Sequence, residues 1–121
     1  MSMNSAQIME TVVKAMDSKK AIDIKVLDIS SVTTMADYFV ICQGNSGIQM
    51  KAISEEIEEK LSEQGVNPIG REGMSTAYWI LMDYSDVIVH VFSNESRGFY
   101  SIENLWSDAP EVDISEFLTQ E

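Results

Sequence analysis

The chain has 121 residues, 45% of them hydrophobic, which predicts one domain with a single core. The chain has twenty acidic and eight basic residues, and residues 61–121 hold eleven of the acids but only two of the bases. This charge argues against binding to a phosphate backbone and favours a basic protein as partner. The single cysteine, Cys42, excludes an internal disulfide, and no apolar run suits a signal peptide or a membrane span, so we expect a cytoplasmic protein.

The first part of the chain predicts one helix and two strands. Asn4 or Ser5 can cap the helix, with Gln7 three residues after Asn4, and its apolar stripe consists of Ile8, Val12, Val13 and Met16. Residues 22–26 alternate between apolar and polar side chains and predict a half-buried strand, and residues 30–37 predict a loop. The unbroken apolar run at residues 38–42 predicts a central strand covered on both faces, in which Cys42 is a buried, inert thiol.

A longer helix follows this central strand. Ser46 and Gln49 predict a capping box at its start, and its buried face consists of Met50, Ile53, Ile57 and Leu61. Gly65 ends the helix, and residues 67–75 predict a loop.

The second half predicts a β-hairpin and a short helix. Residues 78–82 and 87–92 predict two strands joined by a turn at residues 83–86, and Ser93 caps the helix that follows. We predict one domain over residues 1–110 and a loosely packed acidic C-terminal tail over residues 111–121. The order α-β-β-α-β-β-α predicts an α+β domain with a mixed sheet flanked by helices.

Few residues in this chain suit catalysis or metal binding. His90 is the one histidine, and its strand neighbours predict a packed or partner-facing ring before a catalytic one. With one His, one Cys and no closely spaced ligand pair, we predict neither a metal nor a cofactor, and we do not expect an enzyme. Asp83 and Asp86 resemble paired carboxylates, but their turn position equally fits aspartates bonded to the backbone.

The residues between the central strand and the longer helix leave an alternative open. Gly44, Asn45, Ser46 and Gly47 occupy the place of a phosphate-binding loop, so a nucleotide-binding or nucleotidyl-transferring enzyme using residues 44–49 is the alternative function. The segment lacks the Lys-Ser/Thr ending of a P-loop, and neither later strand carries two alternating carboxylates for magnesium.

Aromatic residues concentrate around the predicted hairpin. Seven of the ten aromatics lie within residues 78–106, and five of them are tyrosines or tryptophans, namely Tyr78, Trp79, Tyr84, Tyr100 and Trp106. Aromatic side chains near Arg and Asp are typical anchors of protein interfaces, although tryptophans at the edge of a core give the same pattern.

Four stretches of the sequence resemble the ribosome-silencing-factor family, also called Iojap-like proteins. They are ADYFVI at residues 36–41, GNS at residues 44–46 with Gln49, WILMDYSDVIVHVF at residues 79–92 and RGFYSIENLWSDA at residues 97–109. The four stretches follow one another in the expected order, and the resemblance extends over most of residues 8–109. The chain departs from the family pattern at Ser85, where glycine is usual, and at Ser101, where aspartate is common.

This resemblance implies a fold related to nucleotidyltransferases without their catalytic residues. It also implies binding to a basic ribosomal protein, number fourteen of the large subunit, and repression of translation under nutrient limitation because the bound factor blocks joining of the small subunit. The residues that it places at the interface are Trp79, Asp83, Tyr84, Asp86, His90, Glu95, Arg97, Tyr100, Leu105 and Trp106. A homodimer of the free protein that uses the same aromatic residues is an alternative partner.

Overall fold

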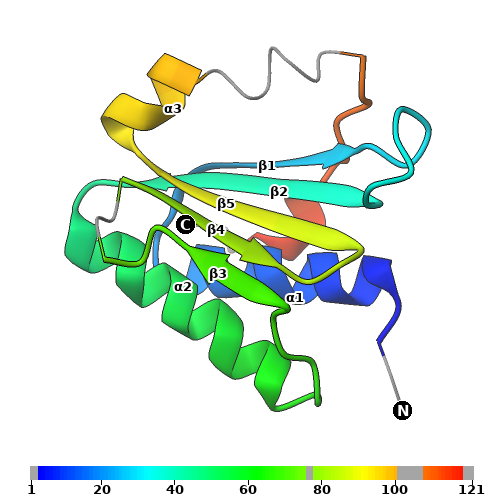
Figure 1. Cartoon of the computed structure of the whole chain (residues 1–121), viewed down its shortest axis with the longest axis horizontal. Helices are drawn as coiled ribbons and strands as arrows, with labels where there is room; N and C mark the ends of the chain where they lie inside the picture. The colour runs from blue at the N-terminus through cyan, green and yellow to red at the C-terminus, as the bar shows by residue number, and fades with distance from the viewer. Residues whose placement is uncertain (1–2, 76–77, 101–107, 119–121) are drawn as a thin grey trace.

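A mixed sheet with helices on both faces forms the molecule in a computed structural model that describes residues 3–75, 78–100 and 108–118 (Figure 1). In the described part of the chain the elements are α1 (Ser5–Ser18), β1 (Ile22–Asp28), β2 (Tyr38–Gly44), α2 (Gly47–Ser62), β3 (Gly70–Glu72), β4 (Trp79–Asp83), β5 (Val87–Ser93), α3 (Asn94–Tyr100) and the short 3-10 helix η1 (Ser115–Phe117). The predicted α+β class is confirmed, whereas a relation to nucleotidyltransferases stays a prediction.

The strands lie in the order β1-β2-β5-β4-β3. Strand β2 pairs in parallel with β5, and the pairs β1–β2, β4–β5 and β3–β4 are antiparallel. The predicted hairpin of residues 78–92 is therefore present as β4 and β5. Strand β2 lies inside the sheet, as its unbroken apolar run predicted, because it has a neighbour on each side.

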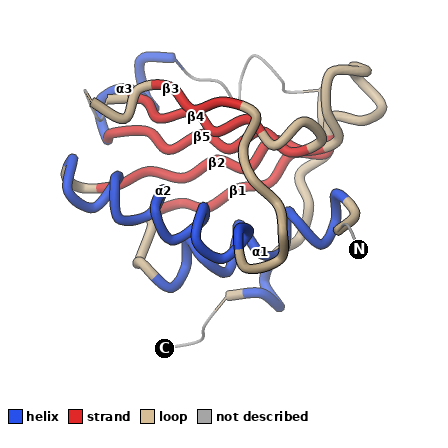
Figure 2. The backbone as a smooth tube through the Cα atoms, turned by 60° about the horizontal axis from the view of Figure 1, so that its bottom comes forward, coloured by secondary structure: helices blue, strands red, loops and turns tan. Residues whose placement is uncertain are grey.

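Helices α1 and α2 pack side by side on one face of the sheet, which we call the helix face (Figure 2). Side chains of β5 that point to this face, Val87, Val89 and Val91, join the same core cluster as the apolar stripes of the two helices. Cys42 belongs to this cluster, and burial raises the pKa of its thiol to about 12, so the predicted inert thiol is confirmed as a buried one.

The predicted N-terminal caps of α1 and α2 are both present, and Ser93 Oγ accepts the Ser96 N–H at 3.1 Å at the start of α3, but the cap of α2 differs in detail. Asn4 and Gln7 form the reciprocal capping box of α1. At α2 the Ser46 hydroxyl accepts the Gln49 backbone N–H at 3.1 Å, whereas the Gln49 side chain accepts the N–H of Asn45 rather than that of Ser46. The same side chain donates to backbone carbonyls just after α1, so Gln49 links the two helices and the predicted capping box is only half formed.

Strand β3 lies within residues 67–75, for which the sequence predicted a loop. Its three residues are exposed, carry no apolar alternation and pair with β4 at the edge of the sheet. Arg71 on β3 forms an ion pair of 2.6 Å with Glu58 on α2. Pairing with β4 and this contact define the strand, and neither is visible in its local sequence.

The C-terminal segment also differs from the prediction of a loosely packed tail. Glu111 bridges to Leu27 of β1, and the N–H of Val112 donates to the carbonyl of Val26 at 2.8 Å. Ile114 is buried in the core on the helix face, and η1 packs against α1 beside it. The prediction is therefore wrong for residues 111–118, because these backbone groups pair with the outer edge of β1.

Candidate partner-binding surface

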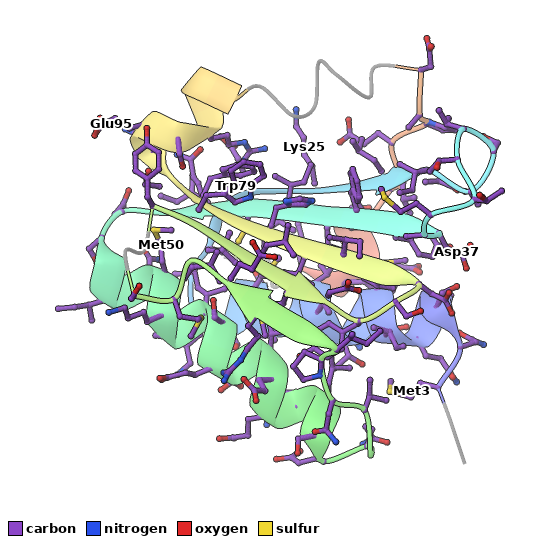
Figure 3. The ribbon with its side chains drawn as sticks, in the orientation of Figure 1. Met3, Lys25, Asp37, Met50, Trp79 and Glu95 are labelled. Carbon is purple, nitrogen blue, oxygen red and sulfur yellow. The ribbon has the colours of Figure 1, made fainter. Side chains whose placement is uncertain are left out.

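The face of the sheet opposite α1 and α2, which we call the open face, carries an aromatic cluster formed by Phe39, Trp79, His90 and Phe92. These side chains come from β2, β4 and β5, and Figure 3 shows Trp79 on the side of the sheet that faces away from α1 and α2. Trp79 stacks on Phe92 with ring centroids 5.1 Å apart, and His90 meets the edge of Phe39 at 4.9 Å. Trp79 and Leu81 are only half-buried, so this face keeps an accessible apolar area.

His90 lies at the centre of the aromatic cluster. The residue is 3% exposed, so of the packed and partner-facing positions that the sequence left open, the structure shows the packed one. The indole N–H of Trp79 donates to its Nδ1 at 3.1 Å, and burial lowers the pKa of His90 to about 4. The ring is therefore neutral at pH 7. The unfolded ring titrates near pH 6.5 and takes up a proton that the folded ring does not. The free energy of unfolding therefore decreases as the pH falls from 6.5 towards 4.

Asp83 and Asp86 flank the turn between β4 and β5. Asp83 Oδ1 accepts the backbone N–H of Ser85 at 2.8 Å, while the carbonyl of Asp86 accepts the backbone N–H groups of Asp37 and Tyr38. Asp86 is exposed and Asp83 is half-buried on the same face as Trp79, two residues beyond Leu81. The backbone bond of Asp83 fits the aspartate-in-a-turn interpretation rather than a catalytic pair.

Ser85 holds this turn in a conformation that favours glycine, since its φ is +71°. We expect Ser85→Gly to raise the free energy of unfolding by about 0.5–1 kcal/mol, because relief of the left-handed backbone outweighs the added chain entropy. Urea denaturation of the two proteins measures this difference. Ser31 is an exposed turn residue whose φ is not positive, so Ser31→Gly should instead lower the free energy of unfolding slightly. Equal changes in the free energy of unfolding for the two variants would contradict strain at Ser85.

Tyr84 does not belong to the open face. Its side chain is 5% exposed and packs in the core cluster with α1 and α2. Burial, with the nearby Glu58 carboxylate, raises the pKa of its phenol, and within the described part of the chain the phenolic oxygen has no hydrogen-bond partner. The prediction of Tyr84 as a surface residue is corrected, because Tyr84 continues the strand alternation on the side of Ile80 and Met82, which is the helix face.

Helix α3 carries Glu95 and Arg97, which the structure places in different environments. Arg97 is 7% exposed, and its Nη1 donates to the carbonyl of Asp23 at 2.7 Å, which ties α3 to β1. Ser96 Oγ bonds the carbonyl of Tyr78 at 2.5 Å and so ties the same helix to the beginning of β4. Glu95 is exposed at the first turn. The prediction of Arg97 as an interface residue on the surface is therefore corrected: Arg97 is buried and holds α3 in place.

The remaining predicted residues lie in or beyond α3. Tyr100 is the last residue of this helix, and Leu105 and Trp106 lie outside the described residues. Within the described chain, the structure places Trp79, Asp83 and His90 on the open face, Asp86 in the turn between β4 and β5, and Glu95 in the first turn of α3. The sequence reasoning missed Phe39 and Phe92, although the alternation along β5 from His90 to Phe92 was a signal for the latter.

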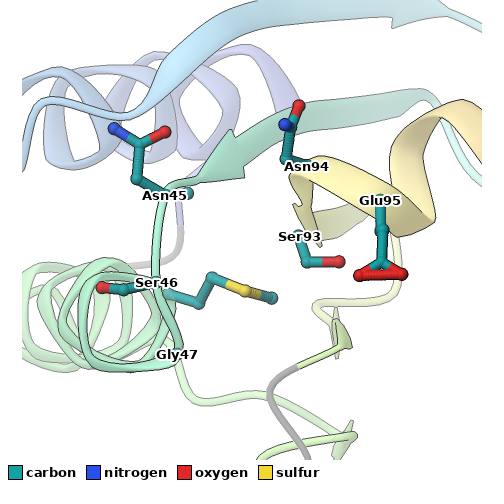
Figure 4. Close-up of a pocket in the computed structure, with 8 residues that line it drawn as sticks. Asn45, Ser46, Gly47, Ser93, Asn94 and Glu95 are labelled. Atoms are coloured by element: carbon teal, nitrogen blue, oxygen red, sulfur yellow. The ribbon is translucent and has the colours of Figure 1, made fainter.

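The predicted loop at residues 44–47 borders a cavity of about 330 Å³ (Figure 4). Its opposite wall consists of Ser93, Asn94 and Glu95 at the beginning of α3. The described residues that line it include no lysine or arginine, and the exposed carboxylate of Glu95 disfavours a phosphate. Elsewhere in the described chain, no three His, Cys, Asp or Glu residues gather as a metal site.

The sequence of this chain is similar to that of one known protein family. A family model described as "Ribosomal silencing factor during starvation" matches residues 2–121. Ribosomal silencing factor RsfS of Bacillus subtilis is 42% identical over 118 residues, which are 98% of this chain and 100% of that protein. The chloroplastic protein Iojap of Zea mays is 29% identical over 101 residues, 84% of this chain and 44% of its own length.

A solved structure agrees with the fold. A crystal structure of a protein from Chromobacterium violaceum superimposes with a TM-score of 0.84 at 35% identity and covers 87% of this chain and 88% of its own. In the described part of the chain, no helix has the length and apolar character needed to span a membrane.

Proposed function

Because this chain belongs to the family of ribosomal silencing factors, we propose that it binds a basic protein of the large ribosomal subunit and blocks joining of the small subunit. The expected partner is ribosomal protein number fourteen. The block is steric, since the bound factor occupies the surface that the small subunit would meet, and its outcome is repression of translation when nutrients are scarce. The action is one of binding, so we do not propose a catalytic step.

The observation that carries the proposal is the half-buried Trp79 on the open face, with the carboxylate of Asp83 on the same face at the other end of β4. A tryptophan that stacks on Phe92 supplies a rigid apolar anchor, the kind of side chain that dominates the energy of protein interfaces. Asp83 and Asp86 add negative charge at the turn of the same hairpin, and Glu95 adds it at the first turn of α3. Carboxylates at the rim of such a contact attract lysine and arginine and speed the encounter with a basic partner.

The net charge of −12 supports the choice of a protein target over ribosomal RNA. Phosphate groups repel a strongly acidic protein, so only a basic protein patch on the subunit offers a favourable field. Long-range attraction of this kind weakens as salt shortens the Debye length to about 8 Å at physiological ionic strength.

Sedimentation of the purified protein with separated ribosomal subunits tests the proposal. We expect the protein to comigrate with the large subunit and to reduce the amount of assembled ribosomes when small subunits are added. A protein that stays at the top of the gradient at low and moderate salt would refute it. A dilution series of the free protein tests the homodimer: if a dimer forms and dissociates on the large subunit, the two contacts share a surface.

Replacing Asp83 by lysine is expected to weaken binding to the large subunit most at low salt, because the change reverses a rim charge. Lysine also removes the acceptor that holds the Ser85 N–H. Asp83→Asn is the matched control, since it retains an oxygen acceptor and removes only the charge; it should weaken binding less than lysine with the same salt trend. Affinities measured at several salt concentrations check this, and parent-like binding by Asp83→Lys at low salt would remove Asp83 from the interface.

A further inference from the structure

His90 and Trp79 are joined across neighbouring strands by a side-chain hydrogen bond. In the β4–β5 pair, Trp79 lies opposite Phe92 and Leu81 lies opposite His90, so Trp79 and His90 are diagonal neighbours on the open face. The indole N–H donates to His90 Nδ1 at 3.1 Å, with ring centroids 5.8 Å apart. One partner, His90, is buried, and the other, Trp79, is half-buried.

The ring of His90 is fixed from both sides. Phe92 lies nearly parallel to it at 6°, with centroids 5.9 Å apart, and Phe39 meets it edge-on at 4.9 Å and 78°. Phe39 comes from β2 and Phe92 from β5, the paired inner strands of the sheet. The imidazole therefore gives Trp79 an acceptor whose position is set by the core.

The second ring nitrogen shows that a histidine is costly at this position. Because Nδ1 accepts the indole N–H, the hydrogen of the neutral ring is on Nε2. Nε2 is buried and has no hydrogen-bond partner among the residues that the structure describes. Such an unsatisfied group destabilises a fold, and a phenyl ring here would avoid the penalty. A phenyl ring would also take away the acceptor of the Trp79 indole N–H, so what the histidine adds at this position is its bond to Trp79.

We propose that His90 is a positioning residue for partner binding, which fixes the angle of the Trp79 indole through Nδ1 and makes no contact with the partner itself. The inference rests on the proposed function, since it assigns Trp79 as the anchor. It changes the role that the sequence suggested for His90 from a contact residue to a residue that acts through Trp79. Its burial at 3% exposure agrees with an indirect role.

Two substitutions separate this role from packing. His90→Phe keeps an aromatic ring and removes the acceptor, and we expect about fivefold weaker binding to the large subunit without loss of the fold. His90→Asn places an amide oxygen near the position of Nδ1, so it should restore part of the affinity although it packs less well. A merely structural histidine predicts the opposite order, with the asparagine variant the weaker binder.

A double-mutant cycle tests whether His90 acts through Trp79. If it does, Trp79→Ala and the double variant Trp79→Ala/His90→Phe bind equally within about twofold, because the ring to be positioned is absent. Additive losses would overturn the inference and make His90 a separate contact. Parent-like binding by His90→Phe would overturn it too, while the weaker binding of Trp79→Ala would leave the proposed function standing. A parent protein that does not bind the large subunit overturns both.

Nuclear magnetic resonance of the parent protein examines the bond without any substitution. We expect a ¹⁵N–¹⁵N coupling between Trp79 Nε1 and His90 Nδ1 across the hydrogen bond, and ring nitrogen shifts of a histidine protonated at Nε2. The Trp79 indole signal is assigned as the one absent from Trp79→Phe. An Nδ1-protonated ring would overturn the inference even if every variant failed to fold.

Discussion

Replacing Trp79 by alanine is expected to weaken binding to the large ribosomal subunit about 30-fold at every salt concentration. The indole stacks on Phe92 and is held by His90, so it meets a partner with little loss of side-chain freedom. An aromatic anchor of this kind costs about 2 kcal/mol or more on truncation, which corresponds to that change in affinity. Its contribution is apolar, so salt should alter it little. Titration of labelled protein with large subunits measures the effect.

Ile48→Ala is the control for this substitution. Ile48 is 84% exposed on α2, which packs on the helix face and not on the open face. Its removal should leave the affinity unchanged within about twofold. If both variants bind as the parent does, the open face is not the contact surface; if Ile48→Ala is the weaker binder, the contact lies near the beginning of α2.

Replacing Gly73 by alanine is expected to lower the free energy of unfolding by about 3 kcal/mol. Gly73 has a φ of +82°, and a Cβ there would overlap the carbonyl oxygen of Trp79 and come within 3.0 Å of its carbonyl carbon. The left-handed backbone accounts for about 1 kcal/mol and the displaced backbone for about 2 more. Urea denaturation measures the loss. Because the displaced strand carries Trp79, binding to the large subunit should fall as well.

Gly65 provides a matched control for Gly73. Its φ is +80°, but a Cβ there would have no neighbour within 4 Å. Gly65→Ala should therefore cost only the backbone contribution, about 1 kcal/mol, and leave binding unchanged. If the two alanines lower the free energy of unfolding equally, the backbone around Trp79 moves away from the new Cβ at no cost in stability. The close approach of Gly73 to the Trp79 carbonyl would then not contribute to stability.

Local patterns were sufficient for most of the secondary structure. The apolar stripe after Asn4 became α1, the unbroken run at residues 38–42 became the inner strand β2, and residues 78–92 became a hairpin. Each of these patterns has the period of its own element, so it can be recognised without knowledge of the neighbours. Strand β3 has no such pattern, since it depends on pairing with β4.

For the candidate surface, the sequence identified the segment but not the direction of each side chain. Strand alternation places Trp79, Leu81 and Asp83 on one face, and this could be inferred. The same alternation places Tyr84 with Ile80 and Met82 on the opposite face, where the α1–α2 core buries it, so its direction could also have been inferred. Arg97 reads as a surface cation in the sequence, yet its guanidinium bonds to a carbonyl 74 residues earlier in the chain.

The sequence by itself therefore determined the α+β class, the family, the acidic character and the segment that contains Trp79. These depend on composition and on spacings within a few residues. The tertiary structure alone decided that His90 holds the Trp79 indole, that Arg97 is buried, and that residues 111–118 dock against β1 and α1. The physical reason is that hydrogen bonds and burial between distant segments depend on strand order and register, which no local pattern encodes.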